Sequence, residues 1–597
     1  MRVAAVFQDR CQPEKCNQEC INYCPPVRNG IICIQLSREH GKSEIIEDLC
    51  IGCGICVNKC PFDAIRVVNL ADELNDEMVH RFGENAFRLF RLPVPKAGRV
   101  IGMLGPNGVG KTTAVNILAG FHHPNLGKYE QGAAPKWDAI LDAYSGTEIG
   151  EYFKFMQAPG FKPSVKPQYV DKLPQVAKGL VRELLTKKNE RGKLDEIVEK
   201  MNLAGIMDRE LAHLSGGELQ RVAIAAAMLA DASVYFFDEP SSYLDIFERL
   251  RAARAIKELA EKEENRRVLI VEHDLALLDF LADDVHILYG TEGTYGIVTH
   301  ARPVKASVNT YLSGFLREEN VRFRDTEVRF EARPPRSEWK TATLLEFPRM
   351  KKRLGDFDLE VAGGSIKVGE VVGIVGPNAV GKTTFVKTLA GVIDPDEGAL
   401  DSKATTSYKP QYISGEFEDT VESLLRLELQ QTFDSSYFER EVMHPLNLKV
   451  LLNRDVPTLS GGELQRVAIC LCLGREADIY LIDEPSAYLD SNQRVIAAKV
   501  IRRIMEFKGK SALVVDHDVY FIDLLCDSLM VFGGEPSKHG SGKGPFSMHE
   551  GMNQFLATVD VTFRRDNETK RPRINKPGSV KDREQKAAGE YYYLVEG

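Results

Sequence analysis

Short apolar runs that end in acidic residues are the most regular feature of the hydrophobic pattern. One such run occupies Val234–Pro240 and another Ile479–Pro485, and both end in Asp-Glu-Pro. In each half of the chain, a second apolar run ends in Glu272-His273 or in Asp516-His517. Apolar runs of about four to eight residues are typical of buried strands. The pattern therefore predicts pairs of buried strands with chemically reactive residues at their ends.

The motifs around these strands occur twice in the same order, which indicates a duplicated domain. Each copy begins with G-x4-G-K-T, at Gly105–Thr112 and Gly376–Thr383. Each continues with Lys-Pro-Gln-Tyr and then with Leu-Ser-Gly-Gly-Glu-Leu-Gln-Arg-Val-Ala-Ile, which begins at Leu214 and at Leu459. Ser-x-Tyr-Leu-Asp follows the Asp-Glu-Pro of both copies. Two complete sets in one order are not accidental.

The glycine-rich pattern is typical of a loop that binds nucleotide phosphates with its backbone N–H groups. Lys111 and Lys382 would reach the β- and γ-phosphates, and the threonine after each lysine would hold Mg²⁺. The expected ATP contacts of the two loops are Asn107, Gly108, Gly110, Lys111, Thr112, Thr113, Asn378, Gly381, Lys382, Thr383 and Thr384.

The second loop departs from the first at one position, where Ala379 stands in place of Gly108. Alanine is tolerated at a turn glycine where φ is negative. The difference leaves open whether the two sites are equal.

The residues at the strand ends fit the chemistry of ATP hydrolysis. Asp238 and Asp483 end buried strands, where a carboxylate orders Mg²⁺ and its water. Glu239 and Glu484 come next and would polarise the attacking water. The two glycines of each Leu-Ser-Gly-Gly-Glu motif are expected to begin a helix, whose first N–H groups can bind an anion. The other expected site residues are Gln168 and Gln411 for the metal, His273 and His517 for the γ-phosphate, and Ser215, Gly217, Ser460 and Gly462 at the helix starts.

An aromatic platform for adenine is expected upstream of each phosphate loop. Phe87 and Phe357 lie at nearly the same distance before their loop lysines. Either side chain could instead belong to the core, and Phe82 competes for the role in the first half.

An insertion distinguishes the first copy, whose spacing from the loop lysine to Gln168 is longer than the equivalent spacing in the second copy. It lies within residues 121–166. Apolar residues at helical spacing flank Ser145-Gly146, which predicts a helix–loop–helix with an exposed loop. A decorative insertion without function is the alternative. The side chains expected to face the body are Trp137, Ile140, Leu141 and Tyr144.

A basic segment that carries aromatic residues follows each copy, at Val321–Asp325 and at Val561–Asp566, and the second continues through Lys570–Lys576. We expect these segments to be hinges that brace the two halves. They are also the best local candidates for phosphate contacts in an acidic chain. Solvated linker charge is the alternative.

Nine of the twelve cysteines lie before residue 61, a crowding that favours metal binding over disulfides in a cytosolic protein. Cys50–Pro61 has the C-x2-C-x2-C-x3-C-P spacing of [4Fe–4S] ferredoxins, in which the fourth cysteine reaches the other cluster. Structural zinc sites are the alternative.

Exchange of the fourth ligands gives two complete sets of four thiolates. A looser first run, Cys11–Pro25, supplies the cysteines that the second run lacks. The expected sets are Cys50, Cys53, Cys56 with Cys24, and Cys11, Cys16, Cys20 with Cys60, whereas Cys33, Cys470, Cys472 and Cys526 are expected core residues.

Composition and charge narrow the classes of protein further. No run of about eighteen apolar residues is present, so no membrane-spanning helix is expected, and the charged first ten residues do not resemble a signal peptide. We therefore expect a cytoplasmic location. The net charge of −9 does not suggest a nucleic-acid binder, although local Lys/Arg clusters decide that question.

Taken together, the paired motifs resemble the ATP-binding cassette (ABC) family, of which the Leu-Ser-Gly-Gly-Glu signature is most specific. Paired cassettes behind a cysteine-rich domain are similar to ABC subfamily E, the RNase L inhibitor-like ribosome-recycling ATPases. The resemblance implies an α/β chain with two P-loop ABC-type nucleotide-binding domains in tandem, preceded by a ferredoxin-like two-cluster iron–sulfur domain. The expected ranges are 1–75 for the iron–sulfur domain, 76–300 and 336–540 for the cassettes, 301–335 for a hinge and 541–597 for a C-terminal hinge segment.

The resemblance also implies that each signature motif serves the ATP of the other half. Ser460 and Gly462 would complete the site of Lys111, and Ser215 and Gly217 would complete that of Lys382. The head-to-tail pair then forms within one monomer, and ATP holds its halves together until hydrolysis releases them.

The implied function is mechanical, and the implied cofactors are two [4Fe–4S] clusters, ATP and Mg²⁺. ATP-driven closure of the cassettes would move the iron–sulfur domain and split ribosomes beside a class-1 release factor or a Pelota-type rescue factor. The chain would then remain on the small subunit. An alternative hypothesis is an ATP-gated electron-transfer protein. A third hypothesis is a nuclease-binding scaffold, which leaves the ATPase residues without a role.

Overall fold

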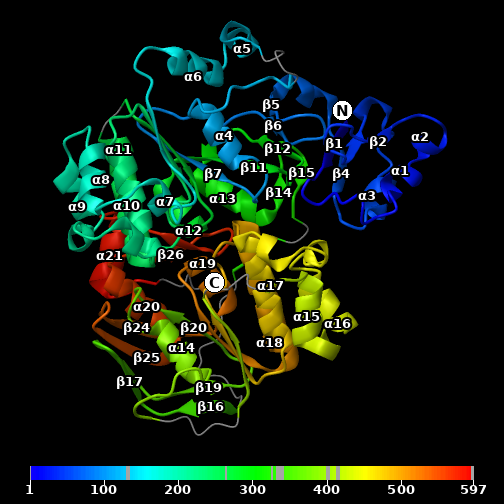
Figure 1. Cartoon of the computed structure of the whole chain (residues 1–597). Coiled ribbons are helices and arrows are strands. Elements are labelled where there is room, and N and C mark those ends of the chain that lie inside the picture. The colour runs from blue at the N-terminus through cyan, green and yellow to red at the C-terminus, as the bar shows by residue number, and fades with distance from the viewer. Residues whose placement is uncertain are drawn as a thin grey trace.

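The computed structural model describes residues 2–129, 135–262, 265–324, 327–330, 342–398, 404–411 and 417–592. Two α/β lobes are stacked in Figure 1, and the N-terminal domain lies beside the first of them. Asp325, Tyr412 and the predicted boundary at residues 335 and 336 lie outside the described residues. Within the described ranges, no helix is both long enough and apolar enough to span a membrane.

The N-terminal domain is a small α/β unit whose core contains many of its cysteines. Its strands β1 and β4 pair antiparallel, as do β2 and β3, and helix α1 packs against α3. Six of the cysteines are buried among few aliphatic side chains. The elements are β1 (Arg2–Val6), α1 (Glu19–Asn22), α2 (Pro25–Arg28), β2 (Ile34–Leu36), β3 (Ser43–Ile45), α3 (Ile55–Lys59) and β4 (Ile65–Asn69).

The first cassette is built on a mixed sheet of order β5-β6-β12-β11-β7-β10-β9-β8, with β13 paired to β11. The neighbours from β11 to β8 are parallel. The strands are β5 (Met78–Arg81), β6 (Arg88–Phe90), β7 (Val100–Leu104), β8 (Pro163–Lys166), β9 (Val234–Asp238), β10 (Arg267–Val271), β11 (Asp284–Thr291), β12 (Tyr295–Val298) and β13 (Arg302–Pro303).

The parallel strands explain the continuous apolar runs in the sequence. All five residues of β7 and of β9 are buried, because parallel strands are covered by helices on both faces. In β10, Val271 is paired with Asp238, so both strands end at the same edge of the sheet. The helices used below are α4 (Lys111–Leu118), α10 (Gly216–Leu229), α11 (Ile246–Glu261) and α12 (Leu275–Leu281).

The second cassette repeats this plan, with the order β17-β18-β25-β24-β20-β23-β22-β21. Its strand β25 runs past residue 540, so the sheet crosses the predicted limit of this domain. The elements are β17 (Met350–Leu354), β18 (Phe357–Val361), β20 (Val371–Val375), α14 (Lys382–Leu389), β21 (Thr406–Lys409), α17 (Gly461–Gly474), β22 (Ile479–Asp483), α18 (Ser491–Lys508), β23 (Ser511–Val515), α19 (Val519–Leu525), β24 (Ser528–Glu535) and β25 (His539–Ser547).

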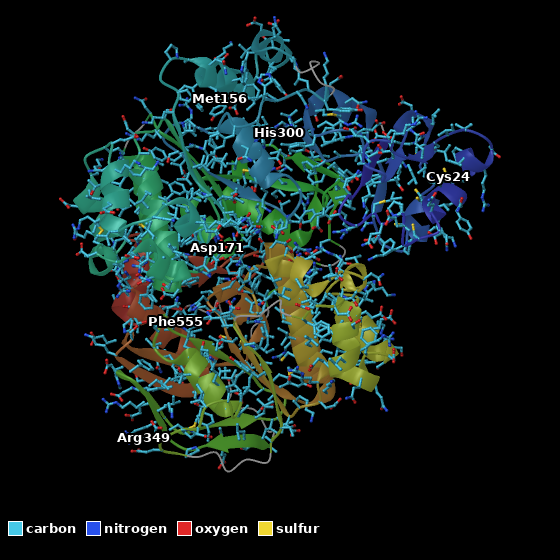
Figure 2. All side chains as sticks on the ribbon, in the orientation of Figure 1. Cys24, Met156, Asp171, His300, Arg349 and Phe555 are labelled. Atoms are coloured by element: carbon cyan, nitrogen blue, oxygen red, sulfur yellow. The ribbon has the colours of Figure 1, made fainter. Side chains whose placement is uncertain are left out.

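The predicted helix–loop–helix is confirmed as α5 (Trp137–Ala143) and α6 (Glu148–Gln157). The hydroxyl of Thr147 caps α6 by accepting from the N–H of Gly150. The four side chains expected to face the body are buried or half-buried, and Ser145–Thr147 is exposed. Met156 marks this insertion at the end of the first cassette that lies farthest from Arg349 in the second (Figure 2).

The C-terminal segment braces the two cassettes, as predicted. Strands β26 (Phe563–Arg565) and β27 (Pro572–Ile574) pair with each other, and β27 packs against both α12 and α19. Arg571 and Arg573 form ion pairs with Asp279 of α12, at 3.1 and 2.7 Å.

The phosphate-contact prediction is wrong for Arg565 and Arg571. Arg565 and Arg571 are buried, with Arg571 0% exposed, and Arg565 pairs with Asp523 of the second cassette. Carboxylates inside the protein pair with these guanidinium groups, because burying an unpaired charge is costly. Of the other basic side chains in this stretch, Arg564 and Arg573 are half-buried, and Lys570 and Lys576 are exposed.

Candidate active sites between the cassettes

Each phosphate loop joins the end of a central strand to the start of a helix. In the first cassette, β7 ends at Leu104 and α4 begins at Lys111. The first N–H groups of a helix carry no internal partner and form an anion site. The equivalent loop of the second cassette lies between β20 and α14. Both loops can therefore hold phosphate with backbone groups.

The loop lysines are buried and held close to the loop backbone. The ammonium of Lys111 donates to the carbonyl oxygens of Gly105 and Pro106, at 2.9 and 2.7 Å. Burial lowers the pKa of Lys111, and it lowers the pKa of Lys382 to about 8. A phosphate group placed here would stabilise the charged form of each lysine.

The predicted adenine residues occupy matching places beneath the two loops. A Cβ on Gly110 would lie 2.7 Å from the ring of Phe87, and a Cβ on Gly381 would lie 3.1 Å from that of Phe357. Both rings are half-buried. Phe82 is 50% exposed and contacts His80 edge to face. Which aromatic side chain stacks on adenine stays a prediction.

Ala379 adopts the left-handed conformation of the glycine that it replaces. Its φ is +59°, and that of Gly108 is +72°. The condition of a negative φ is therefore not met, and the alanine side chain strains the second loop by roughly 1–2 kcal/mol. The two loops share a backbone shape but differ in strain.

We expect Ala379→Gly to raise the free energy of unfolding of the second cassette by about 1 kcal/mol, since glycine adopts positive φ without a steric penalty. Denaturant titration measures the change. Ala390→Gly is the matched control, because Ala390 has a φ of −73° and glycine there should destabilise by about 0.5–1 kcal/mol. A destabilising Ala379→Gly would contradict the strain.

Asp238 and Asp483 have the surroundings of a cation site. Thr112 Oγ1 donates to Asp238 Oδ2 at 3.2 Å, and burial together with Glu239 raises the pKa of Asp238 to about 6. Thr383 lies beside Asp483, yet neither buried carboxylate oxygen of Asp483 makes a hydrogen bond of normal geometry with the described residues. Buried carboxylates without partners are what a hard cation such as Mg²⁺ would bind.

The glutamates after these aspartates are held in a strained backbone conformation. Glu239 and Glu484 both have φ of +48°, which is uncommon for residues other than glycine. The N–H of Glu239 donates to Val271 O at 2.9 Å, and its carbonyl accepts from Gln220 Nε2 at 2.7 Å. Such strain is concentrated at functional sites, where the surrounding contacts fix the side-chain direction.

The sequence analysis did not predict as site residues the side chains that donate hydrogen bonds to the backbone of the Asp-Glu pairs. Gln465 Nε2 donates to the carbonyl of Glu484 at 2.7 Å, in the same way as Gln220 does to Glu239. Lys166 and Lys409 donate from their ammonium groups to the carbonyls of Asp238 and Asp483. The signal was present, since both types of residue belong to the repeated motifs, but their targets are distant in sequence.

The glutamate side chain meets the predicted glutamine and histidine in each site. Gln168 Nε2 donates to Glu239 Oε1 at 2.7 Å, and His273 Nε2 lies 3.5 Å from the same oxygen. The second site repeats this arrangement with Gln411 at 2.8 Å and His517 at 3.7 Å from Glu484 Oε1, and burial raises the pKa of Glu484.

Both histidines are neutral at physiological pH. Burial lowers the pKa of His273 and of His517 well below 6.5, and the nearby lysines Lys111 and Lys382 lower these pKa values further. A neutral imidazole has one N–H donor and one acceptor nitrogen. Each histidine can therefore donate one hydrogen bond to a phosphate oxygen without adding a charge.

Each cassette contributes one aspartate that contacts the phosphate loop of the other, in a head-to-tail arrangement. The N–H of Asn107 in the first loop donates to Asp490 Oδ2 at 3.0 Å, and the N–H of Asn378 in the second donates to Asp245 Oδ2 at 2.8 Å. Both aspartates end the Ser-x-Tyr-Leu-Asp motif, whose role the sequence left open. Each phosphate loop is therefore held by the opposite cassette.

The signature serines lie at the starts of α10 and α17. The Ser215 hydroxyl caps α10 by accepting from the N–H of Glu218, and Ser460 caps α17 through Glu463 in the same way. Ser215 and Ser460 are exposed. Their helix starts are thus free to offer N–H groups to an anion.

The thiols of the N-terminal domain gather into the two predicted sets. Cys24, Cys50, Cys53 and Cys56 line one hollow. Among the described residues, no group of three or more Cys, His, Asp or Glu side chains lies close enough to hold a single ion. Thiols spread around a hollow suit a multi-iron cluster better than one zinc ion, whose four ligands converge on a point.

The thiols of the other predicted set lie close enough to change one another's pKa. Cys11 and Cys16 raise the pKa of the Cys60 thiol, and Cys60 in turn raises that of Cys20, in each case after burial as the larger cause. The exchange of fourth cysteines is therefore supported by proximity in space. Cys33 is fully buried, as predicted, but it also lines the first hollow.

Paired phosphate loops, signature helices and exchanged aspartates define an ABC-type ATPase with its two cassettes in one chain. The ABC transporter family model matches residues 95–242 and 359–487. A model described as a possible Fer4-like domain in RNase L inhibitor matches residues 1–31, and a 4Fe-4S binding domain model matches residues 43–66.

Known proteins resemble the whole chain. An uncharacterized ABC transporter ATP-binding protein of Methanocaldococcus jannaschii is 52% identical over 100% of this chain and 98% of its own length. A solved structure titled "Model of ribosome-bound archaeal Pelota and ABCE1" has a TM-score of 0.93 and 52% identity, and covers 100% of this chain and 99% of the other.

A crystal structure of archaeal ribosomal stalk protein aP1 with archaeal ribosome recycling factor aABCE1 has a TM-score of 0.83 and 53% identity, and covers 88% of this chain and 100% of the other. The chain belongs to subfamily E of the ABC proteins, the RNase L inhibitor family. It is an ATPase with an N-terminal iron–sulfur domain.

Proposed function

We propose that this ATPase is a ribosome-recycling factor that splits ribosomes into subunits after termination or rescue. Closure of the cassettes on ATP would move the iron–sulfur domain, and the chain would stay on the small subunit until hydrolysis. It would act as a cytoplasmic monomer beside a class-1 release factor or a Pelota-type rescue factor. The two similar solved structures support this proposal, because their titles name ribosome-bound Pelota and a ribosome recycling factor.

One observation carries the mechanical part of the proposal: the iron–sulfur domain is joined to the first phosphate loop. Gly293, in the turn between β11 and β12, donates its N–H to Gly108 O at 2.9 Å. A Cβ on Gly293 would lie 2.3 Å from the ring of Phe7 in the iron–sulfur domain. Arg88 of β6 also forms a largely buried ion pair with Glu47 of that domain. Movement of this loop would reach the domain directly.

The iron–sulfur domain also contacts the second cassette. Asn453 Nδ2 donates to Pro61 O at 3.5 Å, so the domain spans from the first cassette toward the signature region of the second (Figure 1). Relative motion of the cassettes would change this contact first. A domain attached firmly to one cassette and weakly to the other is suited to swing when they close.

The site residues would divide the chemistry as their geometry suggests. Lys111 and Lys382 would bind phosphate oxygens, and Glu239 and Glu484 would accept a proton from the attacking water. Bound Mg²⁺ would neutralise charge on the phosphates. The proposed magnesium residues are Thr112, Gln168, Asp238, Thr383, Gln411 and Asp483, and the proposed γ-phosphate donors are His273 and His517.

Two [4Fe–4S] clusters would be held by the two thiol sets described above. Bound clusters would supply rigid cross-links, since metal binding to a small domain contributes folding free energy. The domain has few aliphatic side chains in its core. Rigidity of this kind is what transmission of a closing motion requires.

The test is sedimentation of ribosomes in a sucrose gradient with the chain, a release factor and either ATP or ADP. We expect free subunits with ATP and intact ribosomes with ADP. Cys53→Ser should abolish splitting and spare basal ATPase activity. Cys472→Ser, in the second cassette beside Ser407, is the matched control and should split normally. Splitting in ADP would overturn the proposal, and splitting by Cys53→Ser after cluster loss would overturn the rigid-domain mechanism.

A further inference from the structure

The residue after the exchanged aspartate differs between the two cassettes. Ser491 follows Asp490 at the start of α18, and Ile246 follows Asp245 at the start of α11. Both side chains are buried, with exposures of 2% and 4%. Since Asp490 holds the first phosphate loop, Ser491 is placed beside the first site, and Ile246 is placed beside the second.

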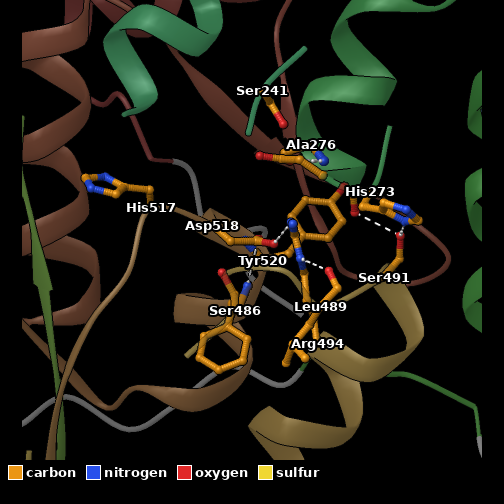
Figure 3. A network of polar contacts seen from close by, with 12 residues as sticks. Ser241, His273, Ala276, Ser486, Leu489, Ser491, Arg494, His517, Asp518 and Tyr520 are labelled. Atoms are coloured by element: carbon orange, nitrogen blue, oxygen red, sulfur yellow. Dashed lines mark hydrogen bonds and ion pairs between the residues drawn. The ribbon is translucent and has the colours of Figure 1, made fainter. Parts of the chain in front are cut away.

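Ser491 contacts the histidine of the opposite cassette at two atoms (Figure 3). Its hydroxyl donates to the carbonyl oxygen of His273 at 2.9 Å, and the same Oγ lies 3.4 Å from His273 Nδ1. In the second site the carbonyl of His517 accepts instead from Arg249 Nη1 at 3.4 Å. Isoleucine at position 246 has no hydroxyl to offer.

The neutral ring of His273 has one proton, which is either on Nδ1 or on Nε2. Burial, Lys111 and Arg494 keep the imidazole neutral by lowering its pKa well below 6.5, so the ring carries one proton. Its Nε2 lies 3.5 Å from the Glu239 carboxylate, and in the proposed function this nitrogen also donates to a γ-phosphate oxygen. If Nε2 keeps the proton to donate, Nδ1 becomes an acceptor and needs a donor.

We propose that Ser491 is a positioning residue for ATP hydrolysis at the first site, where its hydroxyl donates to His273 Nδ1 and fixes the tautomer with the proton on Nε2. Rotation of the hydroxyl moves its proton from the carbonyl of His273 to Nδ1, and both acceptors lie within reach of the same Oγ. The histidine then presents its N–H to the phosphate.

The second site lacks this control, because Ile246 occupies the corresponding position. The tautomer of His517 is therefore not fixed from across the interface by a hydroxyl. The inference predicts that the two sites respond differently to one substitution, although their phosphate loops, glutamates and histidines match. It rests on the proposed role of His273 as a γ-phosphate donor.

The kinetic test is single-turnover hydrolysis of [γ-³²P]ATP by the full chain. A Glu484→Gln background reports the first site, and a Glu239→Gln background reports the second. We expect Ser491→Ala to slow the first site by about tenfold, the loss expected when a buried ring nitrogen has no partner. The second site should stay within about twofold, which also shows that the variant is folded.

Two further variants separate positioning from packing. Ser491→Thr retains the hydroxyl and should restore the first site, whereas a packing role would be worsened by the added methyl group. Ile246→Val is the matched control in the other cassette and should change neither site, because it removes no hydrogen bond. Unchanged first-site hydrolysis in Ser491→Ala, or failure of Ser491→Thr to restore it, would overturn the inference.

The tautomer itself can be measured without turnover. With ring-¹⁵N histidine and a non-hydrolysable ATP analogue, the His273 signal, assigned by its loss in His273→Gln, should show a proton on Nε2. Ser491→Ala should shift this signal toward the Nδ1-protonated form, and an identical signal in both chains would refute the inference. His273→Ala separates the role of Ser491 from the role of His273. If this variant hydrolyses ATP at the full rate in the first site, the proposed role of His273 fails instead.

Discussion

Replacing Glu239 and Glu484 together with glutamine is expected to lower ATP turnover by about 10²–10⁴-fold, the usual contribution of a general base. Glutamine retains the size of glutamate and a carbonyl oxygen that can accept from Gln168 or Gln411. It cannot accept the proton of the attacking water. ATP should therefore remain bound between closed cassettes, whose phosphate loops are held by Asp490 and Asp245 of the opposite cassette.

Steady-state phosphate release measures turnover, and retention of radiolabelled ATP on a gel-filtration column measures the trapped state. Glu199→Gln with Glu584→Gln is the matched control, because both glutamates are exposed on helices outside the sites. This control should turn over ATP at the normal rate. Rapid phosphate release by the Glu239→Gln/Glu484→Gln chain would contradict the water-polarising role of the two glutamates.

Removal of the carboxylate of Asp279 is expected to have the largest effect on stability. The side chain of Asp279 is 1% exposed and pairs with Arg571 and Arg573 across the interface between the first cassette and the C-terminal segment. Arg571 is 0% exposed, so Asp279→Ala leaves a buried guanidinium without its carboxylate. Loss of one partner from a buried ion pair costs about 3–5 kcal/mol.

Denaturant titration of the full chain measures this loss, and the separation of the cassettes can be followed by a pair of fluorescent probes. Asp231→Ala is the matched control, because Asp231 forms an exposed pair with Arg266, at 64% side-chain exposure for the aspartate. An exposed pair is worth about 0–1 kcal/mol. Equal losses in the two variants would show that the C-terminal arginines do not brace the cassettes.

The C-terminal segment also contacts the helices that follow both sites. The hydroxyl of Tyr520 in α19 accepts from Arg571 Nη1 at 2.6 Å, and α19 begins directly after His517 and Asp518 of the second site. Asp279 lies on α12, which begins directly after His273 and Asp274 of the first. The same arginine thus contacts the helices that follow both histidines, so the hinge is placed to sense both sites.

The site chemistry was readable from the sequence because it depends on local spacing. A phosphate loop requires glycines and a lysine within one turn, and the apolar runs before Asp238 and Asp483 have the length that is typical of buried strands. The helix–loop–helix followed from the Ser145-Gly146 break within a helical pattern. The exchange of Cys24 and Cys60 between clusters followed from the known reach of a fourth cysteine and agrees with the arrangement of the thiols.

Other features could not be read in this way, because their causes lie far apart in sequence. The basic C-terminal segment is typical of phosphate binding, yet Arg571 is buried against Asp279, 292 positions away. A left-handed Ala379 is disfavoured by propensity, and only the surrounding loop holds it there. The roles of Gln220 and Gln465 depend on the register that places α10 and α17 against the strand ends.

The sequence by itself determined the duplication and the inserted helices, and its motifs predicted the ATPase chemistry and the thiol sets, because each motif has a characteristic spacing within a short stretch of chain. Only the tertiary structure decided which cassette holds which loop, where the C-terminal arginines find their carboxylates, and that Ser491 faces His273 while Ile246 stands at the other site. Those decisions depend on packing two copies of one fold head to tail, which brings together side chains that no local pattern connects.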